Sequence, residues 1–354
     1  MTSPGQRTVS ALLSRQAALC HRLEAPTYAA LLRHAAADVE VSGKTWEVLE
    51  GREDDPPESS VPLRLMAAIH RAVLEGQAPE LAARFPTAGG EPGDLRGPFD
   101  ELLRARTEEL RRAVMRPCQT NEVGRSCGLL AGLLEISRRT GLPVRLFEIG
   151  SSAGLNLRFD RYRFEGAGAA WGDPSSPVVL SGAFAAPWPP LGGSLRVLER
   201  AGCDVQPLDP SSPEDRLTLL SSVWCDHVER FEMLRAALDL AEGVPVRVDR
   251  ADAASWLEGR VRTPAPGTAT VVFHSVMWQY MTPAGRDRVR SLLEAAGDEA
   301  TAAAPLFWLR QEPTGPEAPG DQEVRLTAWP GGREDLLAMV PPHGRPFRWV
   351  MATS

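Results

Sequence analysis

The stretch that decides the fold is Glu148-Ile-Gly-Ser-Ser-Ala-Gly-Leu-Asn156. It lies at the end of the short apolar run 144–149, which predicts a strand, and at the start of a run with helical spacing. Glycines at positions 150 and 154 allow the backbone to turn tightly and to approach a ligand. A strand, a glycine-bearing turn and a helix in this order indicate the first unit of a parallel α/β sheet.

The chain after Pro143 alternates strand-like and helical runs, which is typical of βαβ units and a Rossmann-like α/β domain. Later strands are predicted at 194–198 with 203–206, 244–248, 270–275 and 305–309, with short edge strands at 323–328 and 347–351. Helices are predicted at 214–241, 253–258, 283–296 and 334–339. Residues 165–193, rich in Gly, Pro and Ser, are longer than an ordinary connection and predict a functional cover or a poorly ordered loop.

The chain before Pro143 has helical periodicity, in segments at 9–23, 28–37, 62–74, 99–115 and 122–139. The last segment is rich in small residues, which predicts the close approach of another element. With 354 residues, the chain is long enough for two domains. We therefore predict a helical N-terminal or cap domain over 1–140 and a Rossmann-like cofactor-binding domain over 141–354.

The composition limits the partners of the protein. A formal net charge of −7 without a Lys/Arg-rich block argues against nucleic acid. No run approaches the roughly 18 apolar residues that span a membrane, and the first residues lack an apolar signal core, so we expect a cytoplasmic protein. The five scattered cysteines predict neither a disulfide framework nor a metal site. A small-molecule substrate is expected, and the oligomeric state is not readable from the sequence.

Three acids stand at three successive predicted strand ends: Glu148, Asp204 and Asp252. Glu148 can accept hydrogen bonds from an ammonium or a hydroxyl, and the amides of the turn suit a carboxylate or phosphate. Asp204 stands where a carboxylate can bind a ribose diol, and Asp252 where an adenine amino group would lie. S-adenosylmethionine offers all these groups. The predicted cofactor-binding residues are Glu148, Gly150, Ser151, Ser152, Gly154, Asn156, Asp204 and Asp252.

Two other interpretations of the turn are weaker. A nicotinamide fingerprint needs a middle glycine where Ser152 stands, and an acid about 20 residues further on. The pattern also fits the nucleophile elbow of a serine hydrolase, with Ser152 as nucleophile, Asp249 or Asp252 as acid and His343 as base. The helical region upstream offers no sheet for such an elbow.

Candidate catalytic residues are His274, Arg125 and Tyr280. His274 ends the fourth predicted strand, where a neutral imidazole can act as a general base, although a buried histidine bonded to a backbone carbonyl fits equally. Trp278 and Tyr280 can form an apolar or cation-binding wall, or belong to the core. Arg125 can pair with a carboxylate of cofactor or substrate, or lie on the surface.

Several segments resemble a bacterial family known as domain of unknown function 2332: 119–125, 147–162, 202–209, 271–275 and 343–345. The resemblance spans nearly the whole chain. From Val144 onward the chain more distantly resembles class I S-adenosylmethionine-dependent methyltransferases. That resemblance implies a seven-stranded sheet, with Glu148, Gly150 and Gly154 in the cofactor turn, Asp204 on the ribose and Asp252 near the adenine; Ser152 departs from the usual glycine.

The sequence thus favours an S-adenosylmethionine-dependent enzyme that acts on a small molecule, with methyl transfer as the default reaction. Three alternatives stay open: a cyclase or lyase that uses the same cofactor without methyl transfer, a non-catalytic nucleoside- or metabolite-binding protein, and a serine hydrolase with Ser152 as nucleophile.

Overall fold

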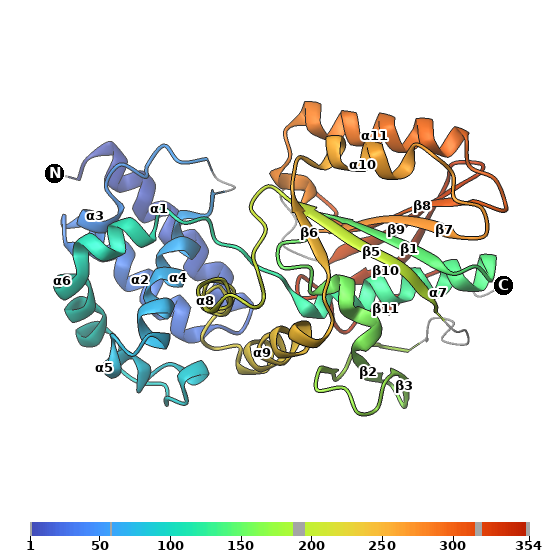
Figure 1. Ribbon diagram of the computed structural model, residues 1–354. Coiled ribbons are helices and arrows are strands. Elements are labelled where there is room, and N and C mark those ends of the chain that lie inside the picture. Colours follow the sequence, from blue (N-terminus) through green and yellow to red (C-terminus); the bar gives the residue numbers. More distant parts are fainter. Residues whose placement is uncertain (1, 57–58, 187–194, 316–320, 352–354) are drawn as a thin grey trace. The chain divides into compact units, whose positions relative to one another are not determined.

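The computed structural model describes residues 2–56, 59–186, 195–315 and 321–351 (Figure 1). The chain divides into two compact units. Unit 1 comprises Met1–Thr120 and Ser212–Arg235, and unit 2 comprises Asn121–Ser211 and Ala236–Ser354. These bounds differ from the predicted 1–140 and 141–354, for reasons that lie in the contacts of two segments described below.

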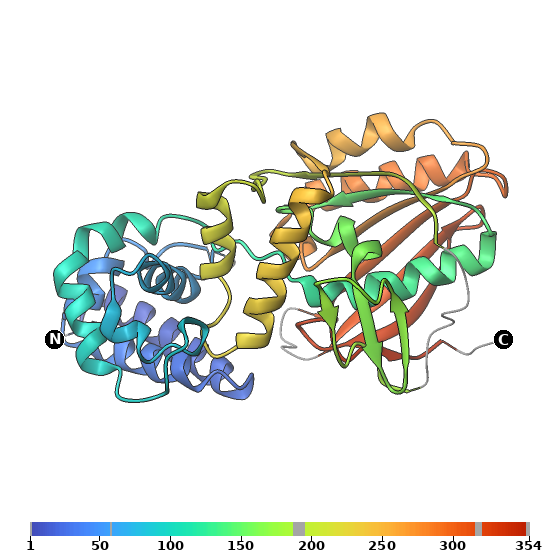
Figure 2. The same ribbon diagram turned by 60° about the horizontal axis from the view of Figure 1, so that its bottom comes forward.

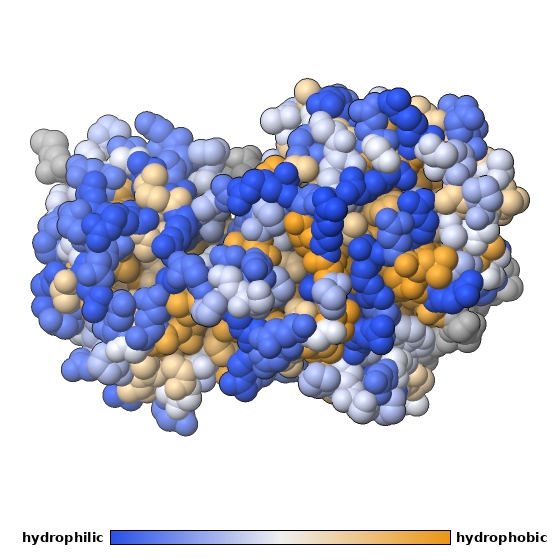
Figure 3. Space-filling view, in the orientation of Figure 1, coloured by the Kyte–Doolittle hydropathy of each residue, from blue (hydrophilic) through white to orange (hydrophobic). Residues whose placement is uncertain are grey.

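Unit 1 is built from helices: α1 (Pro4–Arg22), α2 (Pro26–Glu40), α3 (Lys44–Leu49), α4 (Val61–Leu74), α5 (Pro79–Ala82), α6 (Arg96–Ala113) and α8 (Pro213–Ser221). α1 begins with a capping box. The side chain of Ser3 accepts the backbone N–H of Gln6, and the side chain of Gln6 accepts the backbone N–H of Ser3. The helices are amphipathic and bury apolar residues such as Leu13, Leu32 and Ile69 in one core. Figure 3 shows hydrophilic side chains over most of the visible surface of this unit.

The segment 212–235 belongs to unit 1 because its polar groups complete the helices there. Both carboxylate oxygens of Asp226 accept backbone N–H groups at the start of α2, from Thr27 at 2.9 Å and Tyr28 at 3.2 Å. The predicted single helix over 214–241 is two helices, α8 and α9 (Val228–Gly243). The break between them contains Asp226, whose side chain serves α2.

Unit 2 contains an eight-stranded sheet in the order β11-β10-β9-β8-β7-β1-β5-β6. The five strands from β6 to β8 in this order are parallel to their neighbours, and β9 to β11 continue antiparallel. The fold is therefore mixed α/β with a large, mostly parallel central sheet. The strands are β1 (Val144–Ile149), β5 (Val197–Asp204), β6 (Arg247–Arg250), β7 (Ala269–Ser275), β8 (Leu306–Pro313), β9 (Gln322–Trp329), β10 (Arg333–Val340) and β11 (Arg348–Trp349).

Helices cover both faces of this sheet. On one face α10 (Ala253–Val261) and α11 (Pro283–Asp298) pack over Phe147, Val272 and Trp308. On the other face lies α7 (Ser126–Thr140), which Figure 2 shows crossing the strands. This packing places α7 in unit 2 and not in a domain ending at residue 140.

The small residues of α7 have the predicted use. A Cβ added at Gly128 would lie 2.6 Å from Oε1 of Gln311, and one at Gly132 would overlap the side chain of Leu309. Larger side chains at these positions would hold the helix away from β8. The predicted close approach of another element is confirmed.

Two predictions about the strands of this unit fail. Residues 334–339, predicted as a helix, lie in β10, which pairs with β9 along its length. Good helix formers such as Leu336 and Leu337 accept an extended backbone here because the ladder to β9 outweighs intrinsic propensity. The eight strands also exceed the seven that the methyltransferase resemblance implies.

Part of the predicted long loop over 165–193 forms regular structure. Residues Arg163–Gly166 (β2), Ala169–Gly172 (β3) and Val179–Leu180 (β4) form a separate three-stranded sheet. Residues 187–193 of the predicted loop lie outside the described residues. In the part of the chain that the structure describes, no helix combines the length and the apolar character that crossing a membrane requires.

Candidate functional site

The central strand β1 marks the point where the order of the parallel strands reverses. From β1 the chain adds β5 and β6 on one side, then β7 and β8 on the other. Ligands of open parallel sheets bind outside the carboxyl ends of the strands at such a switch point. The residues there are the turn after β1, Asp204 at the end of β5, and the segment from His274 that ends β7.

The turn after β1 has an unusual backbone. Gly150, Ser152 and Gly154 all lie in the left-handed region, with φ of 69°, 53° and 67°. A Cβ on Gly150 would lie 2.8 Å from Cβ of Met277, and one on Gly154 would lie 2.9 Å from Cγ2 of Val248. Both glycines are thus needed for the conformation and for the packing, and the predicted tight turn is confirmed.

The amides of this turn donate within the protein. Gly150 and Ser151 donate to the Cys203 carbonyl at 2.8 and 3.0 Å, and Ser152 donates to Oδ2 of Asp204 at 2.9 Å. Leu155 donates to Oδ1 of Asn121 at 2.9 Å. The sequence predicted that the turn amides would receive an anion. These amides instead connect the turn after β1 to β5 and to Asn121, which precedes the helix α7.

The predicted helix after the turn is a six-residue 3-10 segment, Asn156–Arg161. Arg158 in this segment is 2% exposed, and its side chain bonds back to the turn. Nη1 donates to the carbonyls of Ala153 and Gly154 at 3.2 and 2.8 Å, and Nε donates to Val244 at 2.8 Å. The α-helix N-terminus that the sequence predicted as an anion site is therefore not present at Asn156–Arg161. Arg158 is the residue that holds the turn.

Glu148 is a buried carboxyl at the site, with 2% of its surface exposed. Burial, and then the charge of Asp204, raise the pKa of Glu148 well above its usual range, while Arg158 opposes the shift. Its Oε2 atom has no hydrogen-bond partner among the described residues. A ligand cation or hydroxyl beside this oxygen would complete its hydrogen bonding, and a cation would favour the ionised form.

Asp204 and Asp252 lie at the ends of β5 and β6 as predicted. The two oxygens of Asp204 accept N–H groups from Ser152 and Gln206, each at 2.9 Å. A carboxylate has about four acceptor sites, so Asp204 retains capacity for a diol. Asp252 is exposed and caps α10 by accepting from Ser255 at 3.1 Å. The role of Asp252 toward an adenine stays a prediction.

His274 stands next to the last residue of β7 and is fully buried. Its Nδ1 lies 2.7 Å from Oε1 of Glu312, and its ring stacks on Trp278 with centroids 5.2 Å apart and planes 9° apart. The partner of His274 is therefore a carboxylate. It is not the backbone carbonyl that a purely structural histidine was expected to bind. Glu312, near the end of β8, was missed by the sequence analysis. The signal that points to it is an acid at the end of an apolar strand.

The other predicted catalytic residues are Tyr280 and Arg125. Tyr280 is 61% exposed, so its ring forms no wall beside His274. Arg125 ends the 3-10 turn Val123–Arg125, and its backbone packs against Gly344. Asn121, which precedes this 3-10 turn, contacts the site, because its Oδ1 accepts the amide N–H of Leu155.

The hydrolase alternative has its acids and its histidine paired elsewhere. Asp249 accepts from Nε1 of Trp256 at 2.8 Å and from Arg260 at 2.9 Å, and Asp252 caps α10. Nδ1 of His343 lies 3.4 Å from Oε2 of Glu122. The positive φ of Ser152 is shared with hydrolase elbows, but it is explained here by the contact between its amide and Asp204.

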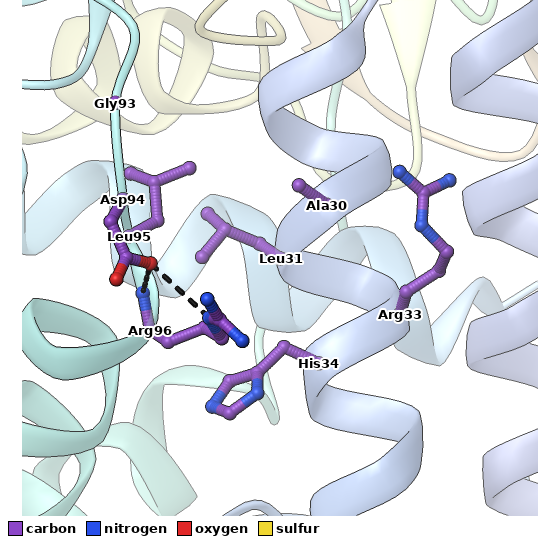
Figure 4. A pocket seen from close by; sticks show the side chains of 8 residues that line it. All are labelled: Ala30, Leu31, Arg33, His34, Gly93, Asp94, Leu95 and Arg96. Atoms are coloured by element: carbon purple, nitrogen blue, oxygen red, sulfur yellow. Dashed lines mark hydrogen bonds and ion pairs between the residues drawn. The ribbon is translucent and has the colours of Figure 1, made fainter.

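A pocket of about 350 Å³ lies in unit 1, between α2 and the segment before α6 (Figure 4). It is lined by Ala30, Leu31, Arg33, His34 and Gly93–Arg96. Arg96 pairs with Asp94 at 3.2 Å with both side chains largely exposed, and His34 pairs with Asp100. These are ordinary surface pairs, so the candidate site stays at the switch point of unit 2.

Comparison with known proteins gives a family and no further relatives. No curated protein and no solved structure matches the chain. The model of one family, described as an uncharacterized protein conserved in bacteria (DUF2332), matches residues 10–349. This match covers nearly the whole chain and agrees with the resemblance of its individual segments, so the protein belongs to this bacterial family.

Proposed function

We propose that unit 2 binds S-adenosylmethionine at the turn after β1 and that the protein is an S-adenosylmethionine-dependent enzyme acting on a small molecule. The proposal places this unit among the class I methyltransferase-like folds. The observation that supports it most is Glu148, a buried carboxyl at the switch point whose Oε2 has no partner among the described residues.

The hydrogen-bonding character of the site favours this cofactor over a dinucleotide. Amides of the turn are occupied by Cys203 and Asp204, so they offer little to a pyrophosphate. Glu148 and Asp204 instead offer acceptors, and these suit an ammonium and a ribose diol. A cofactor with a net positive charge also lowers the free-energy cost of ionising two neighbouring carboxyl groups.

The proposed reaction is methyl transfer to a small acceptor. When bound, the cofactor supplies an electrophilic methyl group. Glu148 and Asp204 hold its polar groups, Arg158 fixes the turn that carries them, and His274 takes a proton from the acceptor. Trp278, stacked on the imidazole, shields it from water. Cyclisation or elimination on the same cofactor would use the same binding groups.

A non-catalytic nucleoside- or metabolite-binding protein is the second candidate. The observation in its favour is that Met277 fills the space beside Gly150 and Trp278 covers His274. Such a protein would bind the nucleoside and show no transfer to any acceptor, whereas an enzyme would release S-adenosylhomocysteine.

Calorimetry of the full chain with S-adenosylhomocysteine tests the proposal. We expect binding, and we expect Asp204→Ala to weaken it by about 1.5–3 kcal/mol, the range for hydrogen bonds to a charged group. Asp209→Ala is the matched control, because Asp209 bonds the amide and hydroxyl of Ser211 in an exposed turn close by. Absence of heat at millimolar ligand, or equal loss in both variants, would contradict the proposal.

A further inference from the structure

We propose that Glu312 is a positioning residue that locks His274 in the tautomer with the proton on Nδ1, and that the bare Nε2 accepts the proton of an O–H or N–H group of the methyl acceptor. The assignment of the acceptor rests on the proposed function. The pairing of His274 with Glu312 and the tautomer do not.

The tautomer follows from the donors around one oxygen. Oε1 of Glu312 lies 2.7 Å from Nδ1 of His274, 3.1 Å from the amide of Met277 and 3.3 Å from the amide of Trp278. Backbone amides only donate, so Oε1 is an acceptor. Nδ1 must therefore carry the hydrogen, and in the neutral ring Nε2 carries the lone pair.

The second nitrogen distinguishes His274 from a structural histidine of the same chain. Buried His70 is bonded on both sides: Nδ1 lies 2.9 Å from the Val223 carbonyl and Nε2 lies 2.8 Å from Oγ1 of Thr87. Burial lowers the pKa of His70 to about 4, which keeps this ring neutral. Nε2 of His274 is equally buried but has no partner among the described residues. The donor it lacks is the kind of group that an acceptor molecule would bring.

A strained residue holds this arrangement in place. Val276 has φ of 50°, and a β-branched residue in the left-handed region is a genuine outlier. Its amide donates to the Gln311 carbonyl at 2.9 Å, and the turn directs the next two amides onto Glu312. Strain of this kind costs about 1–3 kcal/mol and persists where the surroundings impose it, most often at functional sites.

The proton transfer balances with a sulfonium methyl donor. The oxygen or nitrogen of the acceptor forms a bond to the methyl carbon while the carbon–sulfur bond breaks and its electron pair stays on sulfur. The proton of the acceptor passes to Nε2 of His274. The resulting imidazolium keeps its Nδ1–H bond to the Glu312 carboxylate, which stabilises the positive charge.

Nitrogen-15 NMR of the full-length protein labelled at histidine tests the tautomer without substrate. Above pH of about 8, where imidazoles are neutral, two-bond proton–nitrogen spectra distinguish a protonated from a bare nitrogen. We expect His274, assigned by the signals lost in His274→Gln, to be protonated on Nδ1 only. A His274 protonated on Nε2 in the wild type would overturn the proposal.

Two substitutions separate positioning from mere packing. Glu312→Gln keeps an acceptor oxygen and should preserve the tautomer, whereas Glu312→Ala should give a mixture with Nε2–H, while the His70 signals stay unchanged in both. An unchanged tautomer in Glu312→Ala would contradict the role of Glu312. If that variant fails to fold, the wild-type and Glu312→Gln spectra still decide. Absence of S-adenosylhomocysteine binding with the Nδ1–H tautomer present would overturn the acceptor assignment and leave the His274–Glu312 pair standing.

Discussion

Replacing Arg158 with methionine is expected to destabilise unit 2 by about 3–5 kcal/mol, because several backbone carbonyls lose a charged donor and each buried group left unsatisfied costs about 1–3 kcal/mol. The guanidinium donates to carbonyls of Ala153, Gly154 and Val244, and methionine has no donor to replace it. Removing the cation also removes the positive charge that opposes the rise in the pKa of Glu148. The change therefore acts on the turn that carries the candidate site.

Urea unfolding of the full chain measures this effect as a shift of the transition that reports on unit 2. Arg161→Met is the control, because Arg161 belongs to the same 3-10 segment but its side chain is 57% exposed. A surface change of this kind is expected to stay within about 0.5 kcal/mol. Equal shifts for the two variants would show that Arg158 does not hold the turn.

The second large effect is expected from Gly150→Ala, at about 2–5 kcal/mol of lost stability. An alanine must adopt φ near 69°, which costs about 1–2 kcal/mol. Its Cβ also meets Met277 Cβ at 2.8 Å, and overpacking of this size costs about 1–3 kcal/mol. The two contributions have different origins and can be separated.

A double-mutant cycle with Met277→Gly separates them. Glycine at 277 removes the atoms that clash with the new Cβ but leaves the backbone cost at position 150. We expect the two substitutions to couple favourably by about 1–2 kcal/mol in chemical denaturation. Strict additivity would show that the turn after β1 and the segment after β7 are not packed as described.

The sequence predicts the strand, the turn and the acid of the candidate site because their signals are local. The apolar run of β1, the glycines at 150 and 154 and the acid ending β5 are all readable in short windows. Arg158 and Glu312 are not. Arg158 looks like a surface residue of a helix until the 3-10 geometry turns it inward, and Glu312 is separated from His274 by 38 residues.

The failures have a common physical reason, which is that non-local contacts override local preference. Residues 334–339 favour a helix by composition but pair with β9 as a strand. Residues 212–235 follow β5 in sequence but complete α2 through Asp226 in unit 1. No window of sequence contains both partners of such contacts, so periodicity alone does not reveal them.

Hydrogen exchange of the full chain, with and without S-adenosylhomocysteine, is the measurement that tests the central claim most directly. The account predicts slower exchange in peptides covering 148–156 and 203–206, because the ligand would close over Glu148 and Asp204, and no change in peptides from α4. Unchanged exchange at saturating ligand, or protection confined to unit 1, would contradict a cofactor site at the turn after β1.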